Sequence, residues 1–377
     1  MNPIATITFL GAIQGVFFGL VLLRWPNGNR LALRFLSMFL LFFSLSMLGI
    51  VAYSTRFVLQ YPHLAQLHIP LDAALGAPFL MYILVLSQND FRLRRWHWLL
   101  FLPLLIYVAW LIPFYLLSAE EKRTILEASY TAIPKAWRLR FAISNFLNFG
   151  YIIASFVLII RHERIIKELY SSTRAKSLLW ARDLQVAGAA VFALCVLFSG
   201  YDIDLANDLS NLAFSIVIYV FSYRAIRQPD IFKEFSHQPL PVEANPPLQR
   251  QPGKYEKSGL SEVKAPTLLE KLDTLMEKER LYLQPDLNLL QLAERLGTPP
   301  HQVSQLLNQY RQTNFFDFVN RYRVAHFQQI ATDPDNAHLS ILALAFDSGF
   351  NSKASFNAVF RKITGTTPSA FRAANPN

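Results

Sequence analysis

The sequence predicts an all-α protein: a bundle of seven transmembrane helices followed by a soluble domain with two helix-turn-helix units. First, 53% of the 377 residues are hydrophobic and only 16% are charged, whereas soluble proteins average about 25% charged residues. Second, the long apolar runs are confined to residues 1–235. Third, residues 267–377 show the apolar spacing of amphipathic helices. This composition excludes a disordered chain, and a single cysteine, Cys195, excludes a disulfide scaffold.

The transmembrane bundle is predicted from run length. A helix of about 20 apolar residues crosses the hydrocarbon core of a bilayer, and backbone groups in lipid must be satisfied within the helix. Seven runs meet this length, at 4–23, 31–53, 64–87, 98–117, 141–160, 184–201 and 205–223. Residues 1–235 are therefore expected to form a seven-span domain with the two ends of the bundle on opposite sides.

The loop charges predict the orientation. Residues 1–235 carry +8 of the chain's net charge of +10. Counted between the predicted spans, 15 Lys and Arg residues lie on the side of the C-terminal domain and 6 on the other side. Because cytoplasmic loops are enriched in Lys and Arg, the C-terminal domain is expected in the cytoplasm and the N-terminus outside.

Several polar residues fall inside the predicted spans, where such groups often mark functional sites. Two interpretations stay open: a ligand pocket open to the outer face, or hydrogen bonds between helices and solvation of helix ends. The residues proposed to sense a ligand are His68, Asp72, Asp208 and Asn211. Asn145, Asn148 and Asn207 belong to the same polar groups.

Neither metal-ligand spacing nor a nucleophile elbow nor a phosphate-binding glycine loop is present. The sequence thus predicts no metal, no cofactor and no enzyme.

Residues 236–266 contain six prolines among polar residues and are predicted to form a linker. After it, apolar periodicity and helix-stop signals predict two helix-turn-helix units joined by one longer helix. The expected helices are 267–282, 287–296, 299–310, 315–331, 340–347 and 352–364, with a short last helix opened by Pro368. Ser352 is the expected N-cap of the sixth.

This pattern resembles the DNA-binding domain of the AraC/XylS family of bacterial transcription regulators. The most specific stretch is ILALAFDSGFNSKASFNAVFRKITGTTPSAFR at 341–372. The earlier segments LNLLQLAERLG and FFDFVNRYRVAHFQQI also match the family pattern. The resemblance covers about 110 residues, close to 30% of the chain, and implies a double helix-turn-helix domain at 267–377 that binds double-stranded DNA. Fusion to seven spans implies a location in the bacterial inner membrane.

Helical geometry indicates which side chains face DNA. At 100° per residue, the faces opposite the apolar stripes of 299–310 and 352–364 carry polar or small side chains. The predicted contacts are His301, Ser304, Gln305, Asn308, Arg311, Lys353, Ala354, Asn357, Arg361 and Lys362. Gln and Asn can pair with adenine and Ala can touch a thymine methyl, whereas the cations suit phosphates. The alternative for any single residue is a solvated helix face.

The leading hypothesis is a membrane-bound transcription regulator that couples a signal at the membrane to gene expression. The expected partners are DNA, the lipid bilayer, a small-molecule or membrane signal of unknown identity, and a second copy of the chain. The alternative is a transporter or membrane enzyme with an attached autoregulatory DNA-binding domain, for which Asp72 is the motivation. A passive seven-span anchor ranks last, because one span would suffice.

Overall fold

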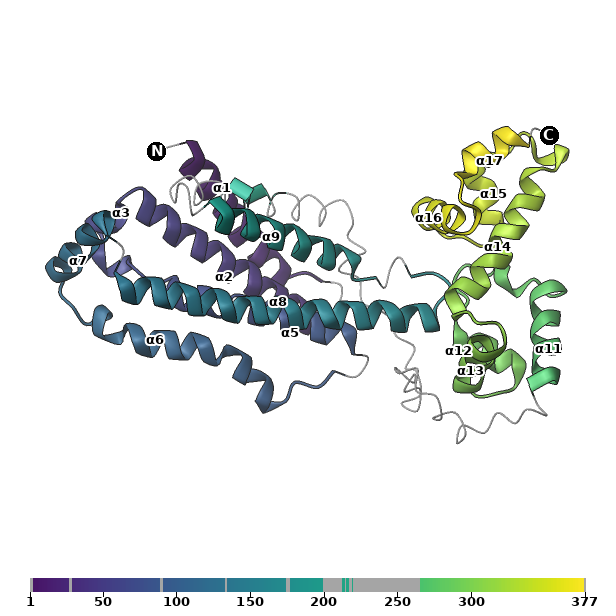
Figure 1. Cartoon of the computed structure of the whole chain (residues 1–377), viewed down its shortest axis with the longest axis horizontal. Coiled ribbons are helices and arrows are strands. Elements are labelled where there is room, and N and C mark those ends of the chain that lie inside the picture. The colour runs from purple at the N-terminus through teal and green to yellow at the C-terminus, as the bar shows by residue number, and fades with distance from the viewer. Residues whose placement is uncertain are drawn as a thin grey trace. The chain divides into compact units, whose positions relative to one another are not determined.

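A computed structural model describes residues 3–26, 29–88, 91–132, 134–173, 177–198, 212, 213, 215, 216, 219 and 265–375. Helices dominate these residues, and the one β-feature among them is an isolated bridge between Tyr170 and Asn288. The predicted all-α class is confirmed (Figure 1).

The chain divides into two compact units. Unit 1 comprises 1–160 and 178–236, and unit 2 comprises 161–177 and 237–377. The sequence predicted a single boundary through a linker at 236–266, most of which lies outside the described residues. It did not predict that a second piece of chain, 161–177, would belong to the C-terminal unit.

The long helices of unit 1 follow the first five predicted spans. They are α1 (Pro3–Leu23), α2 (Arg30–Ser54), α5 (Gly76–Ser87), α6 (Leu102–Tyr115) and α8 (Lys135–Leu169). Shorter elements between them are α3 (Phe57–Gln60), η1 (Pro62–Leu64), α4 (Ile69–Ala73), η2 (Arg95–Phe101) and α7 (Ala119–Thr131). Among the described residues, five segments are long and apolar enough to cross a membrane. The sixth predicted span overlaps α9 (Leu179–Phe198), which is not one of the five, and most of the seventh lies outside the described residues.

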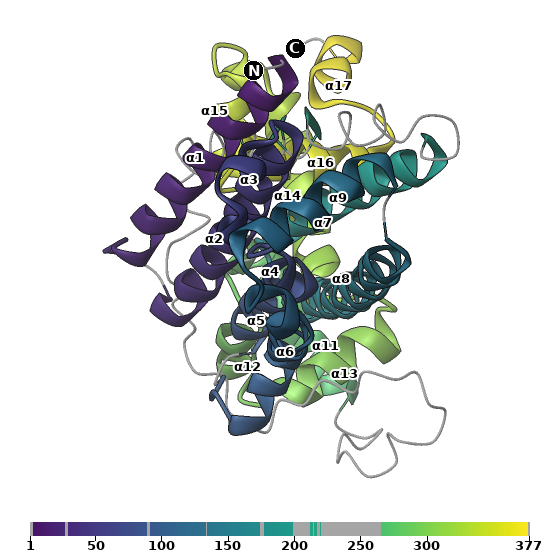
Figure 2. The same ribbon diagram turned by 90° about the vertical axis from the view of Figure 1, so that its left-hand side faces the viewer.

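Helices α1 and α2 lie side by side, as Figures 1 and 2 both show. Their close approach depends on small residues of α1. A Cβ added at Gly19 would come within 3.0 Å of the Leu41 side chain, and the Ser37 hydroxyl donates to the Gly19 carbonyl at 2.6 Å. Close packing over small residues with hydroxyl hydrogen bonds is typical of helices in lipid.

The third predicted span is not one continuous helix. It is split into η1, α4 and α5, with Ala74 and Leu75 between the last two. Asn148 of α8 bridges this break: its amide donates to the Asp72 carbonyl at 2.7 Å and accepts from the Gly76 N–H at 2.8 Å. The side chain therefore satisfies backbone groups that an interrupted helix would leave unpaired.

Large apolar side chains cover much of the exterior of unit 1. Phe146 on α8 is 77% exposed and Leu105 on α6 is 62% exposed. The same surface includes Phe9, Leu10, Ile13, Phe17, Leu20, Trp110, Ile112, Phe141, Phe149, Ile153 and Val157. Exposed apolar surface on this scale is unusual for a protein in water and marks an interaction with another apolar phase or partner.

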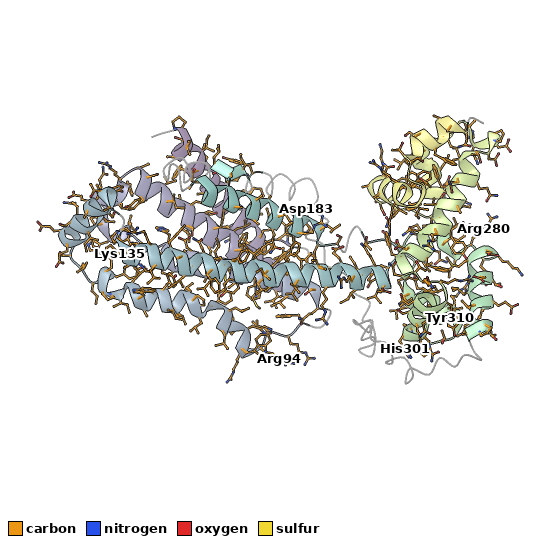
Figure 3. The ribbon with its side chains drawn as sticks, viewed as in Figure 1. Arg94, Lys135, Asp183, Arg280, His301 and Tyr310 are labelled. Atoms are coloured by element: carbon orange, nitrogen blue, oxygen red, sulfur yellow. The ribbon has the colours of Figure 1, made fainter. Side chains whose placement is uncertain are left out.

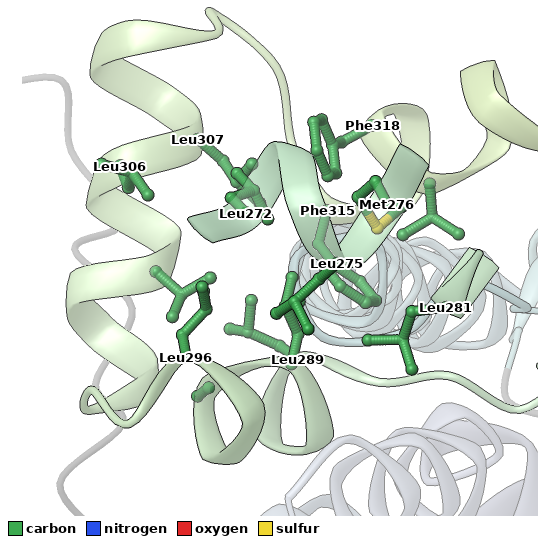
Figure 4. Close-up of a cluster of buried hydrophobic side chains, with 14 of the residues drawn as sticks. Leu272, Leu275, Met276, Leu281, Leu289, Leu296, Leu306, Leu307, Phe315 and Phe318 are labelled. Atoms are coloured by element: carbon green, nitrogen blue, oxygen red, sulfur yellow. The ribbon is translucent and has the colours of Figure 1, made fainter. Parts of the chain in front are cut away.

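Unit 2 buries most of its large apolar side chains. Its helices are α11 (Ala265–Glu277), α12 (Leu289–Leu296), α13 (Pro300–Tyr310), α14 (Phe315–Ala331), α15 (Ile341–Asp347), α16 (Lys353–Thr364) and α17 (Pro368–Ala374). A first core cluster joins α11, α12 and α13 around Leu272, Leu296 and Leu306 (Figure 4). A second gathers α15 and α16 around Phe356 and Phe360.

Helix α14 belongs to both cores. Phe315, Phe318 and Val319 pack into the first cluster, whereas Phe327 and Ala331 pack into the second. The bounds of α14 match the predicted 315–331 helix. One helix therefore fixes the spacing of the two helix-turn-helix units.

The structure corrects three local expectations in unit 2. The helix predicted at 267–282 ends at Glu277, and Arg280 adopts a left-handed conformation with φ 50° before the short turn η5 (Leu281–Leu283). Tyr310 and Ile363 continue the apolar spacing of the predicted helices 299–310 and 352–364 and would be expected inside, but both are exposed. Both lie near the ends of their helices, where the stripe runs out of the core.

Candidate nucleic-acid interface

The first helix-turn-helix unit is formed by α12 and α13. Asn288 caps α12 by accepting from the Gln291 N–H at 3.0 Å, while the Gln291 side chain accepts from the Asn288 N–H at 3.0 Å. Gly297 ends the helix with φ 67°, a conformation that costs glycine little. Pro300 then occupies the first turn of α13, where no helical N–H bond is lost. The local sequence thus sets both ends of the turn.

Three of the residues predicted to face DNA share one stripe of α13. His301 and Asn308 are exposed and Ser304 is half-buried between them, and the Asn308 amide donates to the Ser304 hydroxyl at 3.5 Å. His301 and Tyr310 mark the two ends of this helix in Figure 3. Gln305 differs from its expected exposure: it is buried and donates to Gln309 at 3.2 Å.

The second unit is formed by α15 and α16 around a tight glycine turn. Gly349 has φ 87°, and a Cβ at this position would lie 2.5 Å from the Tyr282 carbonyl oxygen. Ser352 is the N-cap of α16, as predicted, because its hydroxyl accepts from the Ser355 N–H at 3.3 Å. The turn therefore needs glycine for both its backbone conformation and its close packing.

The predicted contacts of α16 also form one stripe. Lys353, Ala354, Asn357 and Arg361 are all exposed, and Lys353, Asn357 and Arg361 recur at intervals of four residues. Residues at i and i+4 lie on the same face of a helix. The buried side of α16, with Phe356 and Phe360, packs in the second core cluster.

The four predicted phosphate contacts are in different electrostatic states. Arg311 pairs with Asp273 of α11 at 2.6 Å, and Lys362 pairs with Asp317 of α14 at 2.7 Å. Among the described residues, Lys353 and Arg361 form no such ion pair. Exposed ion pairs of this kind contribute about 0–1 kcal/mol, so a phosphate can displace either carboxylate at small cost.

A buried arginine joins α14 to the turn that precedes α12. Arg323 of α14 is 1% exposed, and its guanidinium donates to the carbonyls of Tyr282 and Gln284 at 2.8 and 2.7 Å. Burial lowers the pKa of Arg323 to about 10, and the charge of Asp286 opposes this shift. The guanidinium therefore remains charged at neutral pH and depends on these acceptors.

In unit 1, the predicted sensing residues His68 and Asp72 lie together. The Ser46 hydroxyl of α2 donates to the Asp72 carboxylate, and His68 Nε2 lies 3.8 Å from the same carboxylate. The His68 ring packs against Gly49, where a Cβ would come within 2.3 Å of it. Hydrogen bonds between helices are one of the two interpretations that the sequence left open for these residues. That the pair senses a ligand stays a prediction. Asp208 and Asn211 lie outside the described residues.

Sequence reasoning missed a second polar cluster in unit 1. Lys122 is 2% exposed, and its ammonium contacts His63 Nδ1 at 2.9 Å and donates to the Tyr115 carbonyl at 2.8 Å. The Tyr115 hydroxyl donates to the Gln66 carbonyl at 3.1 Å, and Arg140 is also buried. Both cations had been counted only as loop charges for orientation. A lysine inside the amphipathic repeat of α7 was the available signal.

Comparison with known proteins places unit 2 in a class. Residues 292–374, from α12 to α17, match the model of a family described as a helix-turn-helix domain. The chain thus carries a helix-turn-helix domain at its C-terminal end.

Individual relatives match over the same region. The HTH-type transcriptional regulator GlxA of Rhizobium meliloti is 26% identical over 129 residues, which are 34% of this chain and 37% of the relative. An uncharacterized HTH-type transcriptional regulator of Staphylococcus aureus is 28% identical over 107 residues, 28% of this chain and 14% of the relative. The chain therefore spans little more than a third of the first relative's length and less of the second. No solved structure matches the chain.

Proposed function

We propose that the protein is a membrane-embedded, sequence-specific DNA-binding transcription regulator, in which unit 1 receives a signal and unit 2 acts on DNA. The observation that carries this proposal is the pair of helix-turn-helix units fixed on α14, each presenting an exposed stripe of α13 or α16. A helix of this kind fits the major groove, and two of them on one rigid helix suit two successive grooves.

The side chains of the two stripes divide into two roles. Asn308 and Asn357 suit adenine edges, Ala354 suits a thymine methyl, and His301 and Ser304 are further candidates for base contacts. Lys353, Arg361, Arg311 and Lys362 suit phosphates, which position the domain without reading sequence. Gln305 can take part only if its side chain leaves the buried position it occupies.

Asn357 and Arg361 allow a matched test, since they lie one turn apart on α16 and are both exposed. We expect Asn357→Ala to weaken binding by about 1–3 kcal/mol, mostly on sequences that present adenine to it, and Arg361→Ala to weaken all sequences alike and reduce the salt slope by about one. Binding of the full-length protein in lipid nanodiscs to variant duplexes over a salt series measures both. Equal, sequence-independent losses would contradict the division of roles.

Membrane insertion of unit 1 is supported by its apolar exterior and by five segments of sufficient length. With the N-terminus outside, reporter fusions after Phe57 should give an outside signal and fusions after Lys233 a cytoplasmic one. The reverse result at either site contradicts the proposed topology. Extraction of the protein from membranes by carbonate, without detergent, would contradict insertion itself.

Signal reception is proposed for the His68–Asp72 pair, because a hydrogen-bonded carboxylate beside a break between α4 and α5 can rearrange without unfolding a long helix. Asp72→Asn keeps the shape and removes the charge. Expression of target genes should then lose its dependence on the signal while the amount of protein in the membrane stays unchanged. An unaltered response removes Asp72 from the proposed site.

A further inference from the structure

Helix α8 contributes residues to both compact units, because its end from Arg161 onward, and the chain up to Ser177, belong to unit 2. We call residues 165–172 the docking segment. Its centre is Ser171, which is 1% exposed. The N–H and the hydroxyl of Ser171 both donate to the Leu287 carbonyl, at 3.2 and 2.5 Å. The Ser171 carbonyl accepts from the side chains of Asn320 and Arg323, at 3.1 and 3.3 Å.

Apolar contacts reinforce this polar network. Leu169 is part of the first core cluster of unit 2, and Ile165 and Tyr170 pack against that cluster. Tyr170 also forms the isolated β-bridge with Asn288, the N-cap of α12. The docking segment is therefore seated at the start of α12 and along the middle of α14, between the two helix-turn-helix units.

The docking segment lies close to one predicted DNA contact, Asn308, and to the residue that precedes the N-cap of α16. The Glu168 carboxylate lies near the Asn308 side chain and near Asp317, the partner of Lys362. The Ser172 hydroxyl donates to the Asn351 side chain at 2.9 Å, immediately before the N-cap of α16. The segment thus contacts one recognition helix and the entry of the other.

We propose that the docking segment and DNA compete for the same face of unit 2. The proposal rests on the DNA-binding function proposed above. A base edge that pairs with Asn308 has to approach its amide beside the Glu168 carboxylate. DNA carries one negative charge per about 1.7 Å of its axis, so a carboxylate at this face also repels its phosphates.

The competition assigns a regulatory role to the end of α8. When the segment is docked, unit 2 binds DNA weakly, and when it is released, both stripes are free. A signal that favours release therefore increases DNA occupancy, by as much as its differential affinity for the two states allows. The docking segment is the direct continuation of the part of α8 that belongs to unit 1. A movement of α8 in unit 1 can therefore displace the docking segment from unit 2.

A reversible crosslink tests the competition. In full-length protein whose single cysteine is removed by Cys195→Ala, Ser172→Cys and Asn351→Cys together place two thiols where the side chains now meet. The probe is a duplex selected from a random pool by the reduced protein in nanodiscs. We expect the oxidised form to bind it at least about tenfold more weakly, a factor worth about 1.4 kcal/mol. Reduction should restore binding, and added duplex should slow crosslinking.

Two further variants separate docking from charge and folding. Leu169→Asp should undock the segment and raise affinity for the duplex, although it adds a negative charge that by itself would lower affinity. Lys167→Gln, at an exposed position two residues earlier, lowers the net charge by the same one unit, is the matched control and should not raise the affinity. Ser172→Cys alone, in the same Cys195→Ala background, should not respond to oxidation.

The outcomes distinguish the two proposals. If no form of the protein selects a duplex, the proposed function fails. If the crosslink forms in high yield and the oxidised and reduced proteins bind the duplex equally, or the oxidised protein binds it more tightly, the competition is overturned and DNA binding stands. Crosslinking that is insensitive to added duplex overturns it as well.

Discussion

The two units of this chain are both helical, but they expose opposite kinds of side chain. In unit 1, Phe146 is 77% exposed while Lys122 is 2% exposed. In unit 2, Phe327 and Phe360 are fully buried while Lys353 and Arg361 are exposed. The presence of helices therefore does not indicate whether a unit is surrounded by lipid or by water, because a helix satisfies its backbone hydrogen bonds in both environments. The placement of apolar surface distinguishes the two, and it supports lipid around unit 1 and water around unit 2.

The largest expected effect is the removal of Arg323, the one long charged side chain that is buried among the described residues of unit 2. Arg323→Ala leaves the carbonyls of Tyr282 and Gln284 without their donor, and we expect it to destabilise unit 2 by about 3 kcal/mol or more. Hydrogen exchange of α14 amides in the full-length protein measures this. Arg321→Ala, at an exposed site of the same helix, should change protection little. Equal protection in both variants would contradict the central role of Arg323.

A charge on the apolar exterior of unit 1 should have the next largest effect. Phe146→Lys places an ammonium within the predicted span at 141–160, at an expected cost of about 2.5–3.5 kcal/mol for insertion into lipid. The amount of protein in the membrane should fall, while Phe146→Leu should leave it unchanged. Ile363→Lys makes the same kind of change on exposed α16 and should be tolerated. If Phe146→Lys is tolerated as well, the exterior of unit 1 does not face lipid.

Two glycines of unit 2 allow the cost of a left-handed backbone conformation to be measured separately from the cost of a steric clash. Gly349 and Gly365 both have positive φ, but a Cβ would collide with the Tyr282 carbonyl only at Gly349. We expect Gly365→Ala to destabilise unit 2 by about 1 kcal/mol and Gly349→Ala by about 2 kcal/mol or more. Thermal unfolding of unit 2, monitored by its susceptibility to proteolysis, shows which variant is destabilised more. A larger loss at Gly365 would mean that packing at the Gly349 turn adjusts easily.

The smallest effect concerns the start of α16. Ser352→Ala removes the side-chain acceptor for the Ser355 N–H and should cost about 1 kcal/mol. Because the cap fixes the first turn, which carries Lys353 and Ala354, we also expect DNA binding to weaken by about 1 kcal/mol. Ser369→Ala, on the exposed side of α17, is the control for loss of a hydroxyl. The comparison uses the same thermal unfolding measurement together with DNA titration.

Sequence reasoning succeeded where the signal is local. The apolar period and flanking residues of 315–331 predicted α14 to the residue, and the serine before an apolar stripe predicted the cap at Ser352. It could not predict that Asn148 would bridge a break more than 70 residues away, because such contacts have no period along the chain. Gln305 shows the same limit: its helix face was assigned by geometry, whereas its burial depends on what packs against it.

The return of the chain into unit 2 changes what a domain means in this protein. The chain passes between the units at 160–161, at 177–178 and again at 236–237. A fragment cut at the proline-rich stretch would therefore lack Ser171 and Leu169, and would leave the Leu287 carbonyl and part of a core cluster open to water. Such a fragment would therefore expose groups that are buried in the intact protein. Unit 2 is therefore complete only with residues 161–177, which lie far from its other residues along the chain.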